Sequence, residues 1–264
     1  MTRAEHPNMR MRMGAELLHL VESAHEVVRQ HIDDPDEAPR PDYFAASAIL
    51  GYALGAPLAE VRDLGQRAVI AFREILRRRP PLERFQKPIA PATWLDYSIG
   101  SSSVGLVYMY WALLLREDEL AREIAENTWD VPNMGRTRIY PEYRVAYGLR
   151  ELILGRHAQA LSELERLPAS AKKYFHQQAR AIAALARGAR SEVTLAIGDL
   201  SNATRLAMRH EYLPQKRIFA LPGAGLASYA LDHGLMTREE LPGDIVAFPM
   251  ELVCFRDRQG GGGA

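Results

Sequence analysis

The residue pair best suited to metal chemistry is a glutamate and a histidine three positions apart, Glu22 and His25. Side chains three apart share one face of a helix, and two Glu-x-x-His pairs on facing helices can hold a pair of iron ions. No second Glu-x-x-His lies on a plausible partner helix. We therefore expect a solvated helix surface here, with no metal and no cofactor.

Three further features fall short of a catalytic or phosphate-binding site. Cys254 has no cysteine or histidine neighbour, so we expect a small buried apolar side chain and not a nucleophile. The segment Gly223-Ala224-Gly225 lacks the third glycine and the preceding strand of a dinucleotide loop, so its expected role is close helix packing. The basic run from Arg77 to Arg79 fits a helix C-terminus. The sequence thus predicts no catalytic residue and a protein that is not an enzyme.

Two groups of acidic residues could instead recognise a basic protein. Charge runs usually form solvated surface, but complementary charge also speeds association with a cationic partner. Aromatic side chains after the second group could anchor such an interface, although core packing would explain them equally well. The candidate partner-binding residues are Asp33, Asp34, Asp36, Glu37, Glu117, Asp118, Glu119, Glu123, Trp129, Tyr140 and Tyr143.

The segments that must position these residues are predicted to be helices. Apolar side chains recur at steps of three and four, and glycines or prolines separate the periodic segments. The nearest candidate for a strand, Ile245 to Phe255, is interrupted by Pro249. The expected helices span residues 11–32, 42–54, 58–79, about 104–115, 117–127, 140–154, 157–167, 170–187, 191–211 and 219–233.

The helix pairs predict an all-α fold. The segment Tyr147 to Leu161 resembles the tetratricopeptide pattern, in which a small residue lies where two helices cross. An amphipathic hairpin must stack on a neighbour, so we expect antiparallel helical hairpins in a tetratricopeptide-like or bundle arrangement. A single domain should cover residues 1–255, with possible halves 1–130 and 131–255. Residues 256–264 should form a flexible tail or linker.

Charge and composition exclude several function classes. The 264 residues carry 33 Lys and Arg against 33 Asp and Glu, so the basic excess typical of nucleic-acid or anionic-membrane binders is missing. One cysteine permits no intrachain disulfide, and residues 1–20 lack the continuous apolar stretch of a signal peptide. The densest apolar stretch, Val104 to Leu115, is shorter than the ~20 residues that cross a bilayer. We expect a cytoplasmic protein that binds neither nucleic acid nor membrane.

Three segments resemble a known family: Trp94 to Glu119, Tyr140 to Leu167, and above all Arg217 to Ala227 followed by the tail Val246 to Leu252. They are similar to the all-helical immunity proteins of bacterial polymorphic toxin systems, of the immunity protein 49 type. In that family a late helix opens with an apolar Leu-Pro-small-small-Leu stretch, and a proline-containing apolar tail closes the domain. The resemblance implies inhibition of a cognate toxin by direct binding, with no cofactor.

Two hypotheses follow, with an enzyme third. The first is an immunity protein that binds and neutralises a bacterial toxin in the cytoplasm. The second is a tetratricopeptide-like adaptor or regulator that binds a peptide or small ligand in a groove. An enzyme would need residues that converge from distant helices. The sequence assigns no oligomeric state.

Overall fold

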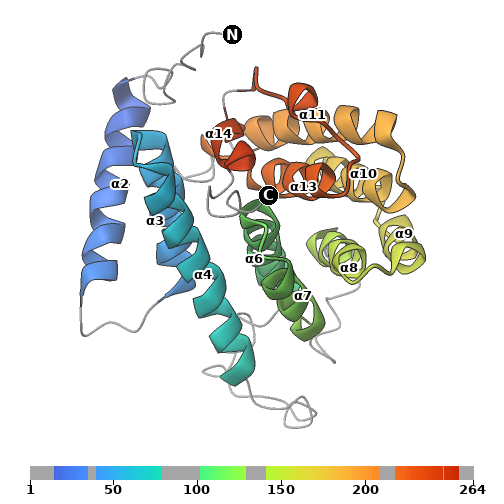
Figure 1. Cartoon of the computed structure of the whole chain (residues 1–264), viewed down its shortest axis with the longest axis horizontal. Helices are drawn as coiled ribbons and strands as arrows, with labels where there is room; N and C mark the ends of the chain where they lie inside the picture. The colour runs from blue at the N-terminus through green and yellow to red at the C-terminus, as the bar shows by residue number, and fades with distance from the viewer. Residues whose placement is uncertain are drawn as a thin grey trace, which may run out of the picture.

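A computed structural model of the chain describes residues 15–34, 40–78, 102–128, 141–207, 218–245 and 247–255. Within these residues all regular structure is helical, so the all-α prediction is confirmed (Figure 1). The helices are α2 (Ala15–Asp33), α3 (Pro41–Leu54), α4 (Leu58–Arg78), α6 (Ser102–Leu115), α7 (Asp118–Asn127), α8 (Pro141–Ile153), α9 (His157–Glu165), α10 (Lys173–Arg187), α11 (Arg190–Ala207), α13 (Leu221–Asp232), the 3-10 helix η3 (Arg238–Glu240) and α14 (Met250–Cys254).

Consecutive helices pack in pairs. Short turns join α3 to α4, α6 to α7, α8 to α9 and α10 to α11, and each pair is in contact along its helices (Figure 1). Three of these turns place Gly55, Gly155 and Gly188 at positive φ, a conformation that glycine adopts without a steric penalty. The fourth turn uses Arg116, at φ 61°, which nothing in the sequence pattern indicated.

Helix α6 lies at the centre of the fold, between the α2–α4 layer and the α8–α11 hairpins (Figure 1). It packs against α4, α7, α8 and α13, and Trp111 and Tyr110 on it are fully buried. One continuous set of buried apolar side chains extends from Val21 on α2 to Val253 on α14. The apolar character of residues 105–115 therefore reflects burial by other helices, except at Val107, which is 41% exposed. None of the described helices combines the length and the apolar character that a membrane span requires.

Glycines allow the central helices to cross closely. A Cβ atom on Gly225 of α13 would lie 2.6 Å from the backbone oxygen of Tyr110 on α6, and one on Gly223 would collide with Ser201 of α11. Close packing, as expected for Gly-Ala-Gly, is thereby confirmed. Gly148 plays the same part where α8 crosses α9, because a Cβ there would lie 2.5 Å from a methyl carbon of Leu164. This is the small residue that the tetratricopeptide-like pattern predicted.

Several predicted boundaries are wrong by a few residues. Residues 166–172 form turns, so α10 begins at Lys173 and not at residue 170. Helix α13 begins at Leu221, with Pro222 in its first turn, where a missing N–H costs no hydrogen bond. The described part of α11 ends at Ala207, and residues 208–211 of its predicted range lie outside the described residues. The apolar tail forms α14, and the charged residues before it form η3.

We expect Gly225→Ala to destabilise the protein, whereas Gly198→Ala should not. A methyl group at residue 225 would force the backbones of α13 and α6 apart, which typically costs about 1–3 kcal/mol. At Gly198 on α11 no described atom lies within 4 Å of a new Cβ, and alanine in a helix gains up to about 1 kcal/mol over glycine. Urea unfolding of both variants measures the difference. Equal unfolding midpoints would contradict a close α6–α13 crossing.

A buried hydrogen bond joins α6 to α10. The Tyr110 hydroxyl donates to Oε1 of Gln178 at 2.8 Å, and each residue is 1% exposed. Burial raises the pKa of Tyr110 well above its ordinary value. The folded protein therefore keeps this proton at pH values where the unfolded chain has released it. The contribution of Tyr110 to the free energy of unfolding is therefore fully present below about pH 10, the ordinary tyrosine pKa. It decreases as the pH rises above that value.

Replacing Tyr110 with phenylalanine should change both the stability and its pH dependence. At neutral pH the variant leaves Gln178 without its donor, which typically costs about 1–3 kcal/mol. Above about pH 10 its stability should fall less steeply with pH than that of the wild type, by about 1.4 kcal/mol per pH unit for the one tyrosine removed. Urea unfolding at pH 7, 10 and 11 measures both the loss of stability and its pH dependence. If the free energies of unfolding of the variant and the wild type change equally with pH, Tyr110 does not have a raised pKa in the folded protein.

Candidate partner-binding surface

Helix α7 carries the larger acidic group on an amphipathic scaffold. Its buried face consists of Ala121, Ile124 and Ala125. Its four exposed charged side chains recur at helical spacing and form one outward stripe: Asp118, Glu119, Arg122 and Glu126. The apolar face holds the helix on α4, α6 and α8, and leaves three carboxylates and one guanidinium in solvent.

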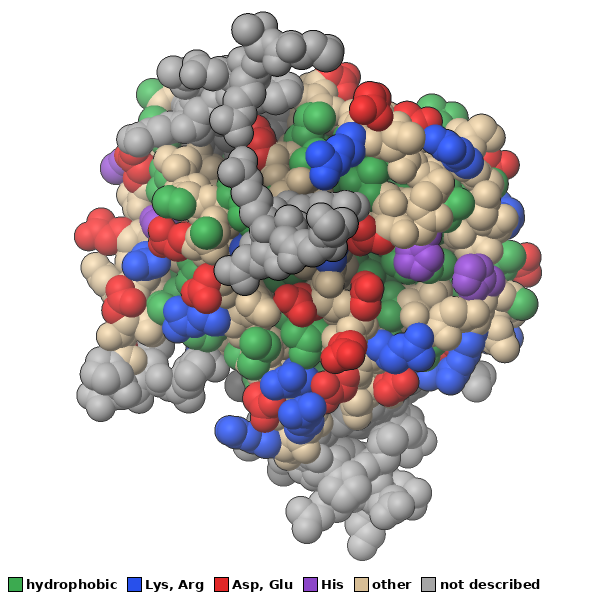
Figure 2. All heavy atoms as spheres, in the orientation of Figure 1, with side chains coloured by type: hydrophobic (Ala, Val, Ile, Leu, Met, Phe, Trp, Pro, Cys, Tyr) green, Lys and Arg blue, Asp and Glu red, His purple; other side chains and the backbone are tan. Residues whose placement is uncertain are grey.

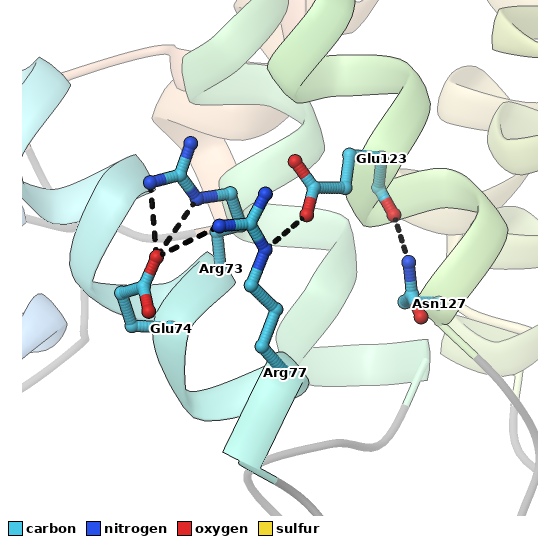
Figure 3. A network of polar contacts seen from close by, with 5 residues as sticks. All are labelled: Arg73, Glu74, Arg77, Glu123 and Asn127. Carbon is cyan, nitrogen blue, oxygen red and sulfur yellow. Dashed lines mark hydrogen bonds and ion pairs between the residues drawn. The ribbon is translucent and has the colours of Figure 1, made fainter.

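The other two acidic residues of this group face α4. Nε2 of Gln66 donates to Glu117 at 2.9 Å, and Nε of Arg77 donates to Glu123 at 2.6 Å (Figure 3). Arg77 also reaches Glu74, at 3.3 Å, and the hydrogen bond with Glu123 raises the pKa of Arg77. Arg77, the first residue of the basic run at the end of α4, therefore also holds α7 against α4.

The structure thus divides the predicted acidic cluster into two sets. Glu117 and Glu123 already hold partners on α4, whereas Asp118 and Glu119 face solvent. Figure 2 shows acidic and basic side chains interleaved over the lower ends of α4 and α7, in place of a purely acidic patch. Helical periodicity alone would not have separated the two sets, because Glu119 and Glu123 are four residues apart and lie on the same side of the helix. Only the packing of α4 against α7 shows that Glu123 has a partner.

The first acidic group lies elsewhere on the surface. Asp33, at the end of α2, has a side chain 67% exposed and lies 3.9 Å from Nε of Arg29, which also pairs with Glu60 of α4. Asp34 follows it, exposed, while Asp36 and Glu37 lie outside the described residues. Helix α2 packs on α3 at one edge of the fold, and α7 packs on α4, α6 and α8 (Figure 1). The structure does not bring the two groups together.

Of the three candidate aromatic anchors, the structure describes one. Tyr143 is half-buried in the first turn of α8, the helix that packs beside α7. Trp129 and Tyr140 lie outside the described residues.

The histidine of the Glu-x-x-His pair does not lie on a solvated face, so that expectation is wrong for His25. It is half-buried between α2 and α3, with Nε2 3.5 Å from Oγ of Ser47, and burial lowers its pKa. The reason is its spacing, because it follows the buried Val21 by four residues and shares its stripe. Within the part of the chain that the structure describes, no group of three or more His, Cys, Asp or Glu side chains could hold a metal ion.

Cys254 lies in α14 and is partly buried, packed against the apolar core. Burial raises the pKa of its thiol, which lowers the thiolate fraction at neutral pH. Its position is that of a packing residue, as expected from the sequence.

A charged cleft between α8 and α9 was missed by the sequence reasoning. It has a volume of about 490 Å³ and is lined by Arg144, Tyr147, Arg150, Glu151, Arg156, Gln159 and Glu163. A signal did exist, because residues 144, 147 and 151 share one face of α8, and residues 159 and 163 share one face of α9. Only the pairing of the two helices shows that these faces line one cleft.

Each glutamate of the cleft lies between two arginines. Arg144 and Arg166 contact Glu163 at 2.6 and 3.0 Å, and Arg150 and Arg156 contact Glu151 at 3.3 and 3.4 Å. The inner groups are well shielded, since the side chains of Arg144 and Glu151 are 14% and 11% exposed. Four guanidinium groups thus surround two carboxylates.

Comparison with protein-family models yields no match, and neither do the searches of curated proteins and of solved structures.

We expect chemical labelling to separate the two sets of carboxylates on α7. Carbodiimide coupling of an amine, mapped by mass spectrometry, should modify Asp118, Glu119 and Glu126 faster than Glu123, because Arg77 covers Glu123. Arg77→Gln should raise labelling at Glu123 and leave Glu126 unchanged.

The matched control is Arg122→Gln, which removes an exposed guanidinium from the same helix without touching the α4 contact. If Glu123 is labelled as fast as Glu126 in the wild type, the brace between α4 and α7 does not exist in solution.

Proposed function

We propose that this protein is an immunity protein, which binds a cognate bacterial toxin in the cytoplasm and neutralises it by direct contact. The proposal combines the resemblance of three sequence segments to the immunity protein 49 type with the surface of α7. The observation that carries it is the outward stripe of Asp118, Glu119 and Glu126 on a helix that its apolar face and the Arg77–Glu123 ion pair hold in place.

The stripe suits a basic partner. Exposed carboxylates attract a cationic protein over roughly 10 Å in 0.1 M salt, so they act mainly on the rate of encounter. Because Arg77 holds Glu123, α7 would not need to rearrange on binding, and a fixed surface loses less entropy. Tyr143 on the neighbouring helix α8 is the aromatic residue best placed to anchor the complex. A nuclease is one kind of toxin with the required basic surface.

Co-expression with the product of the neighbouring toxin gene tests this function. Cells should survive only when this protein is present, and the two chains should elute together in gel filtration. Replacing Asp118 and Glu119 with lysine should slow association at low salt by about tenfold or more, with a smaller effect at high salt. The off-rate should change little, since charges at the rim of an interface act chiefly on encounter.

The matched control reverses two exposed carboxylates on other helices, Glu165 on α9 and Glu192 on α11, with the same change in net charge. It should associate at the wild-type rate. Equal cell death with and without the protein, together with no complex in gel filtration, would refute the immunity function. Survival with equal association rates for both double variants would refute only the choice of α7.

A second candidate function is supported by the cleft between α8 and α9. A tetratricopeptide-like adaptor or regulator binds a peptide or small ligand in a groove, and a cleft of about 490 Å³ lies between the helices whose sequence resembles that pattern. This function would use a different surface from the stripe on α7.

A further inference from the structure

We infer that the cleft between α8 and α9 binds a carboxylate group of a peptide. The inference names the ligand class for the second proposed function and rests on it. The cleft is lined by three arginines and two glutamates, so its walls carry a net positive charge in a protein whose formal net charge is zero.

The excess charge is not neutralised within the cleft. Glu163 pairs with Arg144 and Arg166, and Glu151 pairs with Arg150 and Arg156. Within the lining itself Arg144 balances Glu163, whereas Glu151 faces two guanidinium groups, so the Glu151 set keeps one positive charge. An anion that enters the cleft comes close to this charge, and the partial burial of the Glu151 side chain, which is 11% exposed, strengthens the attraction relative to bulk water.

Two arginines of the lining, Arg144 and Arg156, are only partly used by their contacts with glutamate. A guanidinium has five N–H groups in a planar fork. Arg144 contacts Glu163 through one terminal nitrogen, and its Nε is buried without a hydrogen-bond partner among the described residues. Among the described residues, Arg156 on the other wall is held by one contact, at 3.4 Å to Glu151, and its side chain is 52% exposed. Its guanidinium can turn toward a ligand without breaking a strong bond.

The charge balance favours a carboxylate over a phosphate. A carboxylate carries one negative charge and matches the fork of a single arginine in a bidentate pair. A phosphate dianion would carry its second charge toward Glu151 and Glu163, which both line the cleft. Gln159, also on the wall, can donate to and accept from a peptide backbone beside the carboxylate.

Fluorescence anisotropy at low ionic strength tests this binding. The probes are a labelled tetraglutamate peptide with blocked ends, the matching tetraglutamine peptide, and inorganic phosphate as a competitor. The wild-type protein should bind the glutamate peptide more tightly than the glutamine peptide, and phosphate should compete weakly. Arg156→Gln should weaken binding by about fivefold or more, because hydrogen bonds to charged groups are among the strongest.

Arg166→Gln is the matched control. Arg166 is as exposed as Arg156 and also contacts a cleft glutamate through one terminal nitrogen, but it lies outside the cleft lining. It should bind the peptide like the wild type. Arg156→Lys keeps the charge and loses the fork, so it should fall between the wild type and Arg156→Gln. Thermal unfolding midpoints check that all three variants are folded.

The possible results distinguish carboxylate recognition from groove binding in general and from the immunity function. Equal binding of the glutamate and glutamine peptides would overturn carboxylate recognition and leave groove binding intact. Tight phosphate binding with no peptide binding, equal losses for Arg156→Gln and Arg166→Gln, or no binding of any probe would also overturn it. None of these measurements involves a toxin, so they leave the immunity proposal to its own test.

Discussion

The close crossing of α13 over α6 is the constraint on which the rest of the structure depends. Gly225 lets the two backbones meet, and the fully buried Trp111 and Tyr110 then fill the space on the other sides of α6. Because α6 packs against α4, α7, α8 and α13, a shift of this helix would displace α7 and α8, which carry parts of both candidate binding surfaces. Interiors are packed too densely to absorb such a shift locally. The ion pairs of the surface are therefore positioned by the apolar core and do not position it.

The two candidate binding surfaces differ in how their charges are held. On α7 the contact with Arg77 partly shields Glu123, whose side chain is 28% exposed, and leaves its acidic neighbours in solvent, where salt screens them. In the cleft between α8 and α9 the charges are partly shielded and arranged as alternating signs. The first arrangement suits long-range attraction of a whole protein, and the second suits recognition of one chemical group. One helix, α8, packs against both α7 and α9.

The helices were predictable from the sequence because their apolar periodicity is strong and glycines mark the turns at residues 55, 155 and 188. The roles of Gly148 and of Gly223 to Gly225 were also predictable, since small residues commonly mark close helix crossings. The turn at Arg116 was not, because a non-glycine residue at positive φ has no sequence signature. The division of the α7 carboxylates and the cleft between α8 and α9 depend on which helices become neighbours, which periodicity within one helix does not determine.

The partnership of α6 with α13 also sets an order of events during synthesis. Residues 115 and 221, the end of one helix and the start of the other, are 106 positions apart in the chain. At about 5–20 residues per second, a ribosome needs roughly 5–20 s to make the intervening segment. Throughout this interval one of the most apolar stretches of the protein lacks the helix that covers it. The nascent chain thus presents a binding site for chaperones that the finished protein no longer has.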